Sequence, residues 1–200
     1  NCDFEYQSNF VYTTKKSEVE QIKKEVEYIN SLSFPANFVT KTGLPFTIEG
    51  AIQFPNQAQF NPILYSNGLV DSIIKNNGQI FENTTVTDIK NIDDYFFTYT
   101  KNGTVKSKYV ILASHYPFLN FPGMYFLKMY QSTSYVIAVD TKKTLPSGMY
   151  ISAFAPIFSF RTMNYKGKKI LLLGGCQHKT GETFSYEQTY GALENYAKTL

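Results

Sequence analysis

Residues 57–117 constrain the fold more than any other part of this 200-residue chain. They read as a helix, a strand, a hairpin and a final strand that is apolar throughout. The helix is well delimited, because Asn61 can cap its start, Pro62 suits its first turn and Gly78 suits the position just past its end. Apolar residues recur at helical spacing between these limits, which predicts a helix over residues 62–77.

The strands after this helix differ in character. We expect strands over residues 79–90, 95–100 and 104–113, with the last two joined at Asn102-Gly103, a dipeptide that tolerates the positive φ of a tight hairpin. The last strand alternates at first, but the run 110–113 reads Val-Ile-Leu-Ala. Such a run is typical of a strand that is buried on both faces.

The rest of the chain predicts two further helices, over residues 17–32 and 186–200, and a polar loop over residues 53–61. Ser17 and Glu20 fit a capping box at the start of the first of these helices. Further extended segments are expected over residues 4–12, 38–40, 46–54, 134–140, 149–153, 157–165 and 169–173. Helices interspersed with hairpin-joined strands predict an α+β fold, a mostly antiparallel sheet flanked by helices. With no internal repeat or low-complexity linker, we expect a single domain over residues 1–200.

Composition narrows the function classes. Hydrophobic content of 43% and charged content of 18% indicate an ordered globular chain. The net charge is only +3 and the basic residues are scattered, which argues against a nucleic-acid partner. Cys2 and Cys176 are too far apart in sequence to indicate a disulfide framework or a metal site. No serine, histidine and aspartate set or carboxylate pair indicates a hydrolase.

Targeting signals are not evident in the sequence. No apolar run approaches the roughly 20 residues of a membrane helix, and no signal peptide is visible, so we expect a cytoplasmic protein without a membrane partner. The chain starts Asn-Cys-Asp rather than with methionine. This start suggests a piece of a longer protein.

Several motifs resemble a known family. The stretch Phe-Pro-Asn-Gln-Ala-Gln-Phe-Asn-Pro at residues 54–62 resembles the segment before the substrate-domain helix in FAD-dependent oxidoreductases of the D-amino-acid-oxidase-like group, which includes glycine oxidase and sarcosine oxidase. Residues 78–89 resemble a strand pattern of that group, and residues 108–115 look like the strand that returns to its nucleotide domain. The resemblance implies the substrate domain of a two-domain flavoprotein.

The chain also resembles one bacterial subgroup of this family in particular. The residues that carry this likeness are Ser-His-Tyr-Pro at 114–117, Gly-Met-Tyr-Ile-Ser at 148–152, and the stretch 174–181 that begins Gly-Gly-Cys-Gln-His-Lys. Members of this subgroup often carry a Rieske domain, which implies a 2Fe-2S cluster in a domain outside this chain. Cys176 stands where the subgroup is expected to have an acidic residue.

The resemblance also implies what the chain lacks. The family's Gly-rich dinucleotide fingerprint should precede the first residue, and the segment that closes over the flavin should follow the last. We therefore expect an incomplete FAD site here, with the missing FAD-binding domain as a partner. We also expect the apolar run 110–113, without its covering domain, to lie closer to solvent than its sequence favours.

Six candidate site residues follow from the resemblance. It places Val86, Ala113 and Ser114 beside the FAD. Arg161 is the only arginine, and its guanidinium could grip a substrate carboxylate in a bidentate way; the alternative is a surface arginine on a strand. Tyr150 could contact substrate or simply pack.

His178 completes this set. It could form a polar edge of the pocket or lie in a solvated loop. No catalytic residue and no metal ligand is assigned.

The resemblance implies the substrate-binding part of an FAD-dependent oxidoreductase that oxidises an amine or amino acid by hydride transfer to flavin. The piece alone should be inactive, because half of the flavin site is missing. The rival hypothesis is a non-catalytic binding module that reuses the same sheet. The residues leave open whether electrons pass to oxygen or to an iron–sulfur partner.

Overall fold

The computed structural model describes residues 2–121, 123–141, 146–182 and 185–200. The chain forms two compact units, and the single domain over residues 1–200 stays a prediction. The first unit comprises Asn1–Tyr65 and Ser132–Leu200, and the second comprises Ser66–Gln131. The physical reason is hydrogen bonding, because the strands of each unit pair only with one another.

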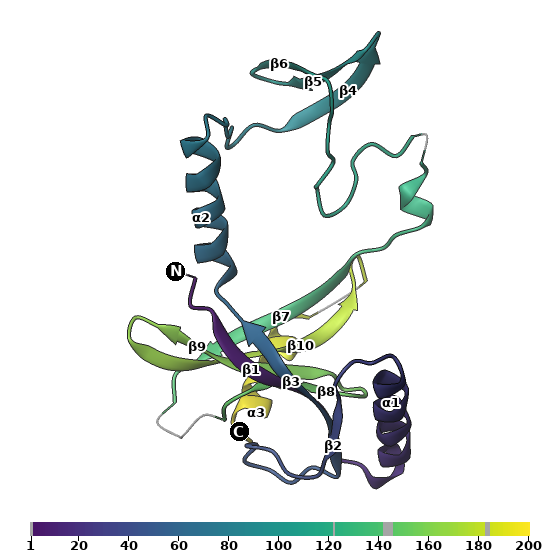
Figure 1. The fold of residues 1–200 in the computed structure, drawn as a ribbon, viewed down its shortest axis with the longest axis vertical. Coiled ribbons are helices and arrows are strands. Elements are labelled where there is room, and N and C mark those ends of the chain that lie inside the picture. The colour runs from purple at the N-terminus through teal and green to yellow at the C-terminus, as the bar shows by residue number, and fades with distance from the viewer. Residues whose placement is uncertain (1, 122, 142–145, 183–184) are drawn as a thin grey trace. The chain divides into compact units, whose positions relative to one another are not determined.

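The first unit is built on a seven-stranded sheet with the order β2-β3-β1-β8-β9-β10-β7 (Figure 1). Neighbouring strands are antiparallel except β1 and β8, which run parallel. The strands are β1 (Glu5–Thr13), β2 (Asn37–Val39), β3 (Gly50–Gln59), β7 (Ser132–Val139), β8 (Met149–Ser152), β9 (Phe158–Tyr165) and β10 (Lys168–Lys179). The predicted mostly antiparallel α+β fold is confirmed.

Two helices pack on this sheet. Helix α1 (Val19–Ser31) lies beside β2 and β3 (Figure 1), where Ile22 and Val26 pack with Ile52. Helix α3 (Tyr186–Ala197) covers β7 and β10, and its Leu193 is fully buried in the larger core cluster. The side chains of that cluster project from the opposite face of the sheet to Ile52, because successive side chains of a strand alternate between faces.

The start of α1 differs from the predicted capping box. A short 3₁₀ turn (η1, Lys16–Glu18) precedes the helix, and Glu18 occupies the N-cap position without a side-chain capping bond. Its carboxylate instead accepts hydrogen bonds from the Thr13 hydroxyl and from Lys15 Nζ, the latter at 3.1 Å. Glu20 pairs with Lys23. The prediction was wrong because the N-cap is Glu18 rather than Ser17, and the Glu20 carboxylate pairs with Lys23 instead of reaching back.

Two strands are longer than their sequences predict. The expected loop over residues 53–61 lies mostly in β3, which runs to Gln59 and continues past an irregularity in its pairing with β1, near Asn56 with φ of 56°. Strand β10 does not end at Gly174-Gly175 but continues to Lys179. Its pairing with β7 is also irregular there, next to Cys176 with φ of 56°. Such bulges let a strand continue through residues that read as turn signals.

Helix α2 (Pro62–Lys75) matches its predicted start closely. Asn61 Oδ1 accepts hydrogen bonds from the backbone N–H groups of Ile63 and Leu64, at 3.1 and 3.3 Å. At the other end Asn77, with φ of 63°, adopts the left-handed conformation that we expected of Gly78. The N–H of Gly78 then bonds to the Ile73 carbonyl at 2.8 Å, which ends the helix in a Schellman motif.

The second unit contains a three-stranded sheet of β4 (Val86–Ile92), β5 (Tyr95–Thr100) and β6 (Gly103–Ser107), together with a short 3₁₀ helix η2 (Tyr125–Leu127). The predicted hairpin at Asn102-Gly103 is confirmed. The strand expected over residues 79–90 begins only at Val86, and the last strand ends at Ser107 rather than at residue 113.

The apolar run 110–113 therefore lies outside any strand. Ile111 is 89% exposed and Leu112 is 45% exposed, which confirms that this run lies closer to solvent than its sequence favours. Backbone pairing across the sheet stops before it. None of the helices in the described part of the chain is long and apolar enough to cross a membrane.

Candidate functional site

One face of the first unit's sheet is only partly covered. Phe10, Tyr150 and Phe160 face the larger core, so the residues beside them in each strand project from the other face. Helix α1 covers that other face over β2 and β3. Over β8, β9 and β10 it carries two hollows, of about 250 and 280 Å³, and Arg161 and Leu172 line both of them. This partly open face is the candidate site.

Arg161 lies between the two hollows on β9, opposite Met149 of β8 and Leu172 of β10. Its side chain is half-buried, and among the described residues it forms no hydrogen bond or ion pair. An arginine keeps its positive charge at any physiological pH, and an unpaired guanidinium away from full hydration favours a bound anion. The geometry therefore suits recognition of a carboxylate.

Glu5 and Gln59 line the first of these hollows together with Arg161. Gln59 is 7% exposed, and its amide nitrogen donates to Glu5 Oε2 at 3.0 Å and to the Thr162 carbonyl at 2.9 Å. Glu5 Oε1 accepts a further hydrogen bond from Gln7 at 2.6 Å. The two amides thus hold the Glu5 carboxylate in place. The hollow offers a fixed negative group and an unpaired positive group.

Sequence reasoning missed Glu5 and Gln59. Gln59 falls in the stretch that was expected to be a loop, and Glu5 falls at the start of a strand with no motif around it. The alternation of Gln57, Ala58 and Gln59 was a weak signal that the stretch is a strand with one polar face. They line the same hollow as Arg161 because β1, β3 and β9 lie near one another. No local sequence pattern predicts that arrangement.

Tyr150 points away from this site into the larger core. It is 2% exposed, stacks between Phe10 and Phe160 with both ring-centroid distances at 5.0 Å, and donates its hydroxyl proton to the Ser147 carbonyl at 2.6 Å. Burial raises the pKa of this hydroxyl, so it stays protonated. This environment is that of a residue that packs in the core, the alternative interpretation of Tyr150.

His178 lies toward the C-terminal end of β10, opposite Thr133 of β7. Its Nδ1 bonds to the Lys179 carbonyl at 2.9 Å, and because a carbonyl only accepts, Nδ1 carries the proton. Nε2 then accepts from the Tyr135 hydroxyl at 3.0 Å. Six residues of strand separate His178 from Leu172, roughly 20 Å at the usual rise. The structure therefore does not bring His178 together with Arg161.

The three residues expected beside FAD lie in the second unit. Val86 is half-buried at the start of β4, whereas Ala113 and Ser114 are exposed in the segment after β6. The Ser114 hydroxyl donates to the Tyr116 carbonyl at 3.1 Å. No backbone–backbone hydrogen bond joins residues 109–114 to the rest of the described chain.

These residues fit only one side of a dinucleotide site. The unpaired backbone of residues 109–114 is free to meet a neighbouring strand or a cofactor. The pyrophosphate of FAD, however, is bound by backbone N–H groups in a Gly-rich turn at a helix start, and the sequence holds no such fingerprint. The residues present therefore do not make the phosphate part of the site.

Comparison with known proteins identifies relatives along the whole chain. The family model described as FAD dependent oxidoreductase matches residues 1–199. A protein of Bacillus subtilis (strain 168) that carries the name Rieske 2Fe-2S iron-sulfur protein YhfW is 31% identical over 199 residues. That alignment covers 100% of this chain and 39% of the relative.

Solved structures share the fold. Glycine oxidase from Bacillus cereus ATCC 14579 superposes with a TM-score of 0.75 at 18% identity, covering 99% of this chain and 56% of that one. Glycine oxidase from Geobacillus kaustophilus gives 0.78 at 16% identity, with 100% and 55% covered. L-proline dehydrogenase from P. horikoshii gives 0.75 at 16% identity, with 100% and 57% covered. The chain thus spans little more than half of these structures, and less of the Bacillus subtilis relative.

Proposed function

Because the chain belongs to the family of FAD-dependent oxidoreductases, we propose that it forms the substrate-binding part of an enzyme that oxidises an amine or amino acid. Two of the related solved structures, glycine oxidase and L-proline dehydrogenase, are named for substrates of this class. The substrate is held on the partly open face of the seven-stranded sheet.

The unpaired guanidinium of Arg161 is the observation that carries this proposal. A substrate carboxylate would meet it through two parallel N–H···O bonds, the strongest arrangement that an arginine offers. The guanidinium forms no ion pair with the described residues, although the carboxylates of Asp3 and Glu5 line the same hollow.

The other end of an amino acid is matched in the same hollow. The Glu5 carboxylate, held by Gln7 and Gln59, attracts the amine end of the substrate, so the hollow complements a molecule with opposite charges at its two ends. The exposed Phe60 and the half-buried Met163 form apolar walls beside these groups. In such surroundings each charge interaction is stronger than in bulk water.

FAD, when bound, would supply the acceptor for the hydride that leaves the carbon next to nitrogen. We place Val86, Ala113 and Ser114 beside it and expect other parts of the protein to hold its phosphates. We also place any 2Fe-2S cluster in a domain outside this chain. His178 remains a proposed polar group at the far end of β10, without a direct contact to the substrate.

Anaerobic flavin bleaching by the full-length protein tests the proposal. Glycine and L-proline are compared with methylamine and pyrrolidine, which have the same amine but no carboxylate. We expect the amino acids to bleach the flavin at lower concentration than their matched amines. A protein that binds FAD but is bleached by no member of the panel would contradict the proposal.

A further inference from the structure

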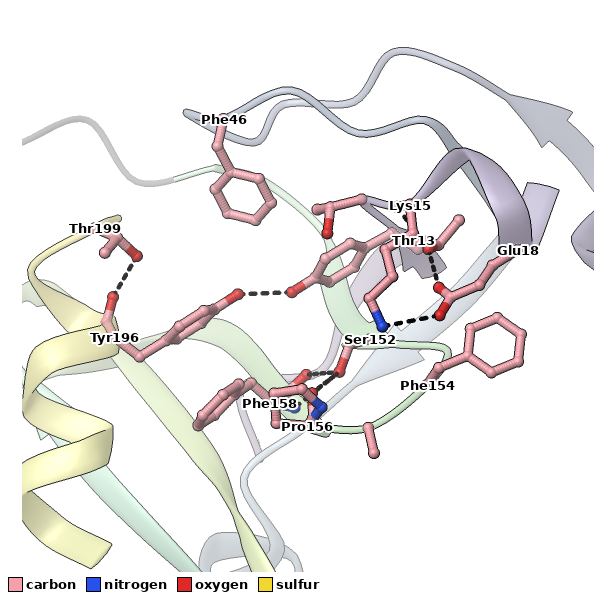
Figure 2. Close-up of a pocket in the computed structure, with 13 residues that line it drawn as sticks. Thr13, Lys15, Glu18, Phe46, Ser152, Phe154, Pro156, Phe158, Tyr196 and Thr199 are labelled. Carbon is pink, nitrogen blue, oxygen red and sulfur yellow. Dashed lines mark hydrogen bonds and ion pairs between the residues drawn. The ribbon is translucent and has the colours of Figure 1, made fainter. Parts of the chain in front are cut away.

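A third hollow, of about 320 Å³, is lined by Phe46, Phe158 and Tyr196 among others (Figure 2). The strand register places it on the other side of the first unit's sheet from Arg161. Tyr12 of β1 lines it and projects from the same face as Tyr150 and Phe160, since Phe10 pairs with Tyr150 and Tyr12 lies two residues further on. Arg161 is the neighbour of Phe160 in β9 and projects from the opposite face. The proposed oxidation site therefore does not use this hollow.

Aromatic rings form most of its wall. The Phe158 and Tyr196 rings stack at 4.2 Å with an interplanar angle of 9°, and Tyr12 lies 5.7 Å from Phe46 between ring centroids. Figure 2 shows Phe46 and Ser152 on opposite sides of the bond that the Tyr196 hydroxyl makes. Phe158 and Tyr196 cover one face of each other, and the remaining ring surfaces give the hollow an apolar lining that favours an apolar occupant.

The charges at the rim cancel. Glu18 accepts hydrogen bonds from Lys15 Nζ, at 3.1 Å, and from the Thr13 hydroxyl, so neither charge is available to an occupant (Figure 2). The Ser152 hydroxyl is also committed, because it accepts from the Phe158 N–H at 2.9 Å and donates to the Pro156 carbonyl at 3.0 Å. A charged occupant would lose its hydration without gaining a counter-charge. The site therefore suits a neutral molecule.

The two tyrosines leave one half-buried donor in the lining, whereas Thr14 and Lys15, which also line the hollow, are exposed. The Tyr12 and Tyr196 hydroxyl oxygens lie 2.7 Å apart, and a single bond between two phenols uses only one of their two protons. Tyr12 is 2% exposed, and a buried proton without an acceptor would cost about 1–3 kcal/mol, so Tyr12 donates to Tyr196. The half-buried Tyr196 is left with an O–H that has no acceptor among the described residues.

We propose that this hollow binds a small, neutral aromatic molecule that carries a carbonyl oxygen. The ring of the ligand packs against Phe158 and Phe46, and its carbonyl accepts the remaining proton of Tyr196. A volume near the lower end of the usual range for ligand sites, about 300–1,000 Å³, limits the ligand to one or two rings. The inference does not depend on the proposed oxidation reaction.

Binding of acetophenone and ethylbenzene to the full-length protein tests this inference, because the two molecules share a ring and a similar shape but only acetophenone has the acceptor. We expect acetophenone to bind more tightly to the wild-type protein. Tyr196→Phe should weaken acetophenone roughly threefold to tenfold, the usual worth of one neutral hydrogen bond, and leave ethylbenzene unchanged.

Tyr12→Phe is the matched control, because it removes the other hydroxyl and leaves Tyr196 its proton. Acetophenone affinity should be retained in this variant. It should also be retained in Arg161→Lys, which excludes binding on the other face of the sheet. Equal losses in Tyr12→Phe and Tyr196→Phe would overturn the proposal, as would equal affinity of the wild-type protein for the two molecules.

The carbonyl stretch of bound acetophenone gives a readout that needs no variant. Hydrogen bonding to Tyr196 should shift it to lower frequency than in a non-polar solvent. A bound carbonyl without that shift in the wild-type protein would also overturn the assignment.

Discussion

At the residue scale, Arg161 and Tyr150 show how the same sheet produces two different environments. They lie on neighbouring strands, and Tyr150 pairs with Phe160, the residue before Arg161. Arg161 therefore projects from the partly open face, and Tyr150 projects into the core. Tyr150 has its ring stacked on both sides and its hydroxyl bonded. Arg161 has no partner among the described residues. Only the arginine is available to a ligand.

Arg161→Lys should raise the KM of the full-length enzyme for L-proline by tenfold or more, on the order of 1.4 kcal/mol. A lysine keeps the charge but cannot make the bidentate contact. Steady-state kinetics measure the change, and pyrrolidine, which has no carboxylate, should show an unchanged KM. If both molecules keep their wild-type KM, Arg161 does not belong to the substrate site.

Tyr150→Phe should lower the free energy of unfolding by about 1 kcal/mol, because it removes one buried hydrogen bond and keeps the stacked ring. Urea unfolding measures the loss. Tyr165→Phe is the control, since Tyr165 is 53% exposed and should change little. A large change in KM with unaltered stability would instead assign Tyr150 to substrate contact.

At the scale of elements, the predictions succeeded where the signal is local. The Asn61 cap of α2 and the Asn102-Gly103 hairpin depend on a few adjacent residues, and both were found. The capping box at Ser17 failed because Glu20, the residue that would reach back, pairs with Lys23 further along the helix. The ends of β3 and β10 were missed because bulges carry strands through turn-like residues.

The candidate site follows the same rule. Arg161 could be selected from the sequence because it is the only arginine and stands on a predicted strand. Glu5 and Gln59 could not be selected from the sequence, because they come near Arg161 only through the pairing of β1 with β3 and the contact of Gln59 with β9. The separation of His178 from Arg161 likewise depends on how far β10 continues.

The turn before α1 should be sensitive to pH. The hydrogen bond from Thr13 and, less strongly, Lys15 lower the pKa of Glu18. A carboxylate with a lowered pKa contributes stability above its unfolded pKa of about 4.3, and this contribution is lost as pH falls through the lower folded pKa. Urea unfolding between pH 6 and roughly 3 should show a smaller acid loss in Glu18→Gln than in the wild-type chain.

Glu25→Gln, on the same helix, is the control for this measurement, because Glu25 has no hydrogen-bond partner among the described residues. It should keep the wild-type pH dependence. Identical acid losses in the wild-type chain and Glu18→Gln would mean that the Glu18 contacts do not stabilise the fold.

At the scale of the whole molecule, the two units differ in how they satisfy their apolar residues. The first unit buries two clusters against its seven-stranded sheet. Helix α2, most of which belongs to the second unit, has no buried residue, and Ile111 and Leu112 of that unit are exposed. The second unit therefore leaves apolar side chains exposed of the kind that the first unit buries.

Hydrogen exchange of the 200-residue chain should reflect this difference. Amides of residues 110–113 have no backbone partner in the described chain and should exchange fastest, while those of Leu171 and Leu173 in β10 should exchange slowest. Mass spectrometry of peptides from both segments measures the rates. Comparable protection of the two segments would show that residues 110–113 are covered in solution.

The parallel pair at the middle of the large sheet has a consequence for folding kinetics. Its register joins Asn9 to Met149, so β1 and β8 can pair only after most of the chain has been synthesised. Closing so long a loop costs conformational entropy that grows slowly, by about 0.6 kcal/mol for each doubling of length. Pairings this distant in sequence place a protein among the slow folders. The antiparallel pair of β1 with β3 can form earlier, but the other edge of β1 must wait for β8.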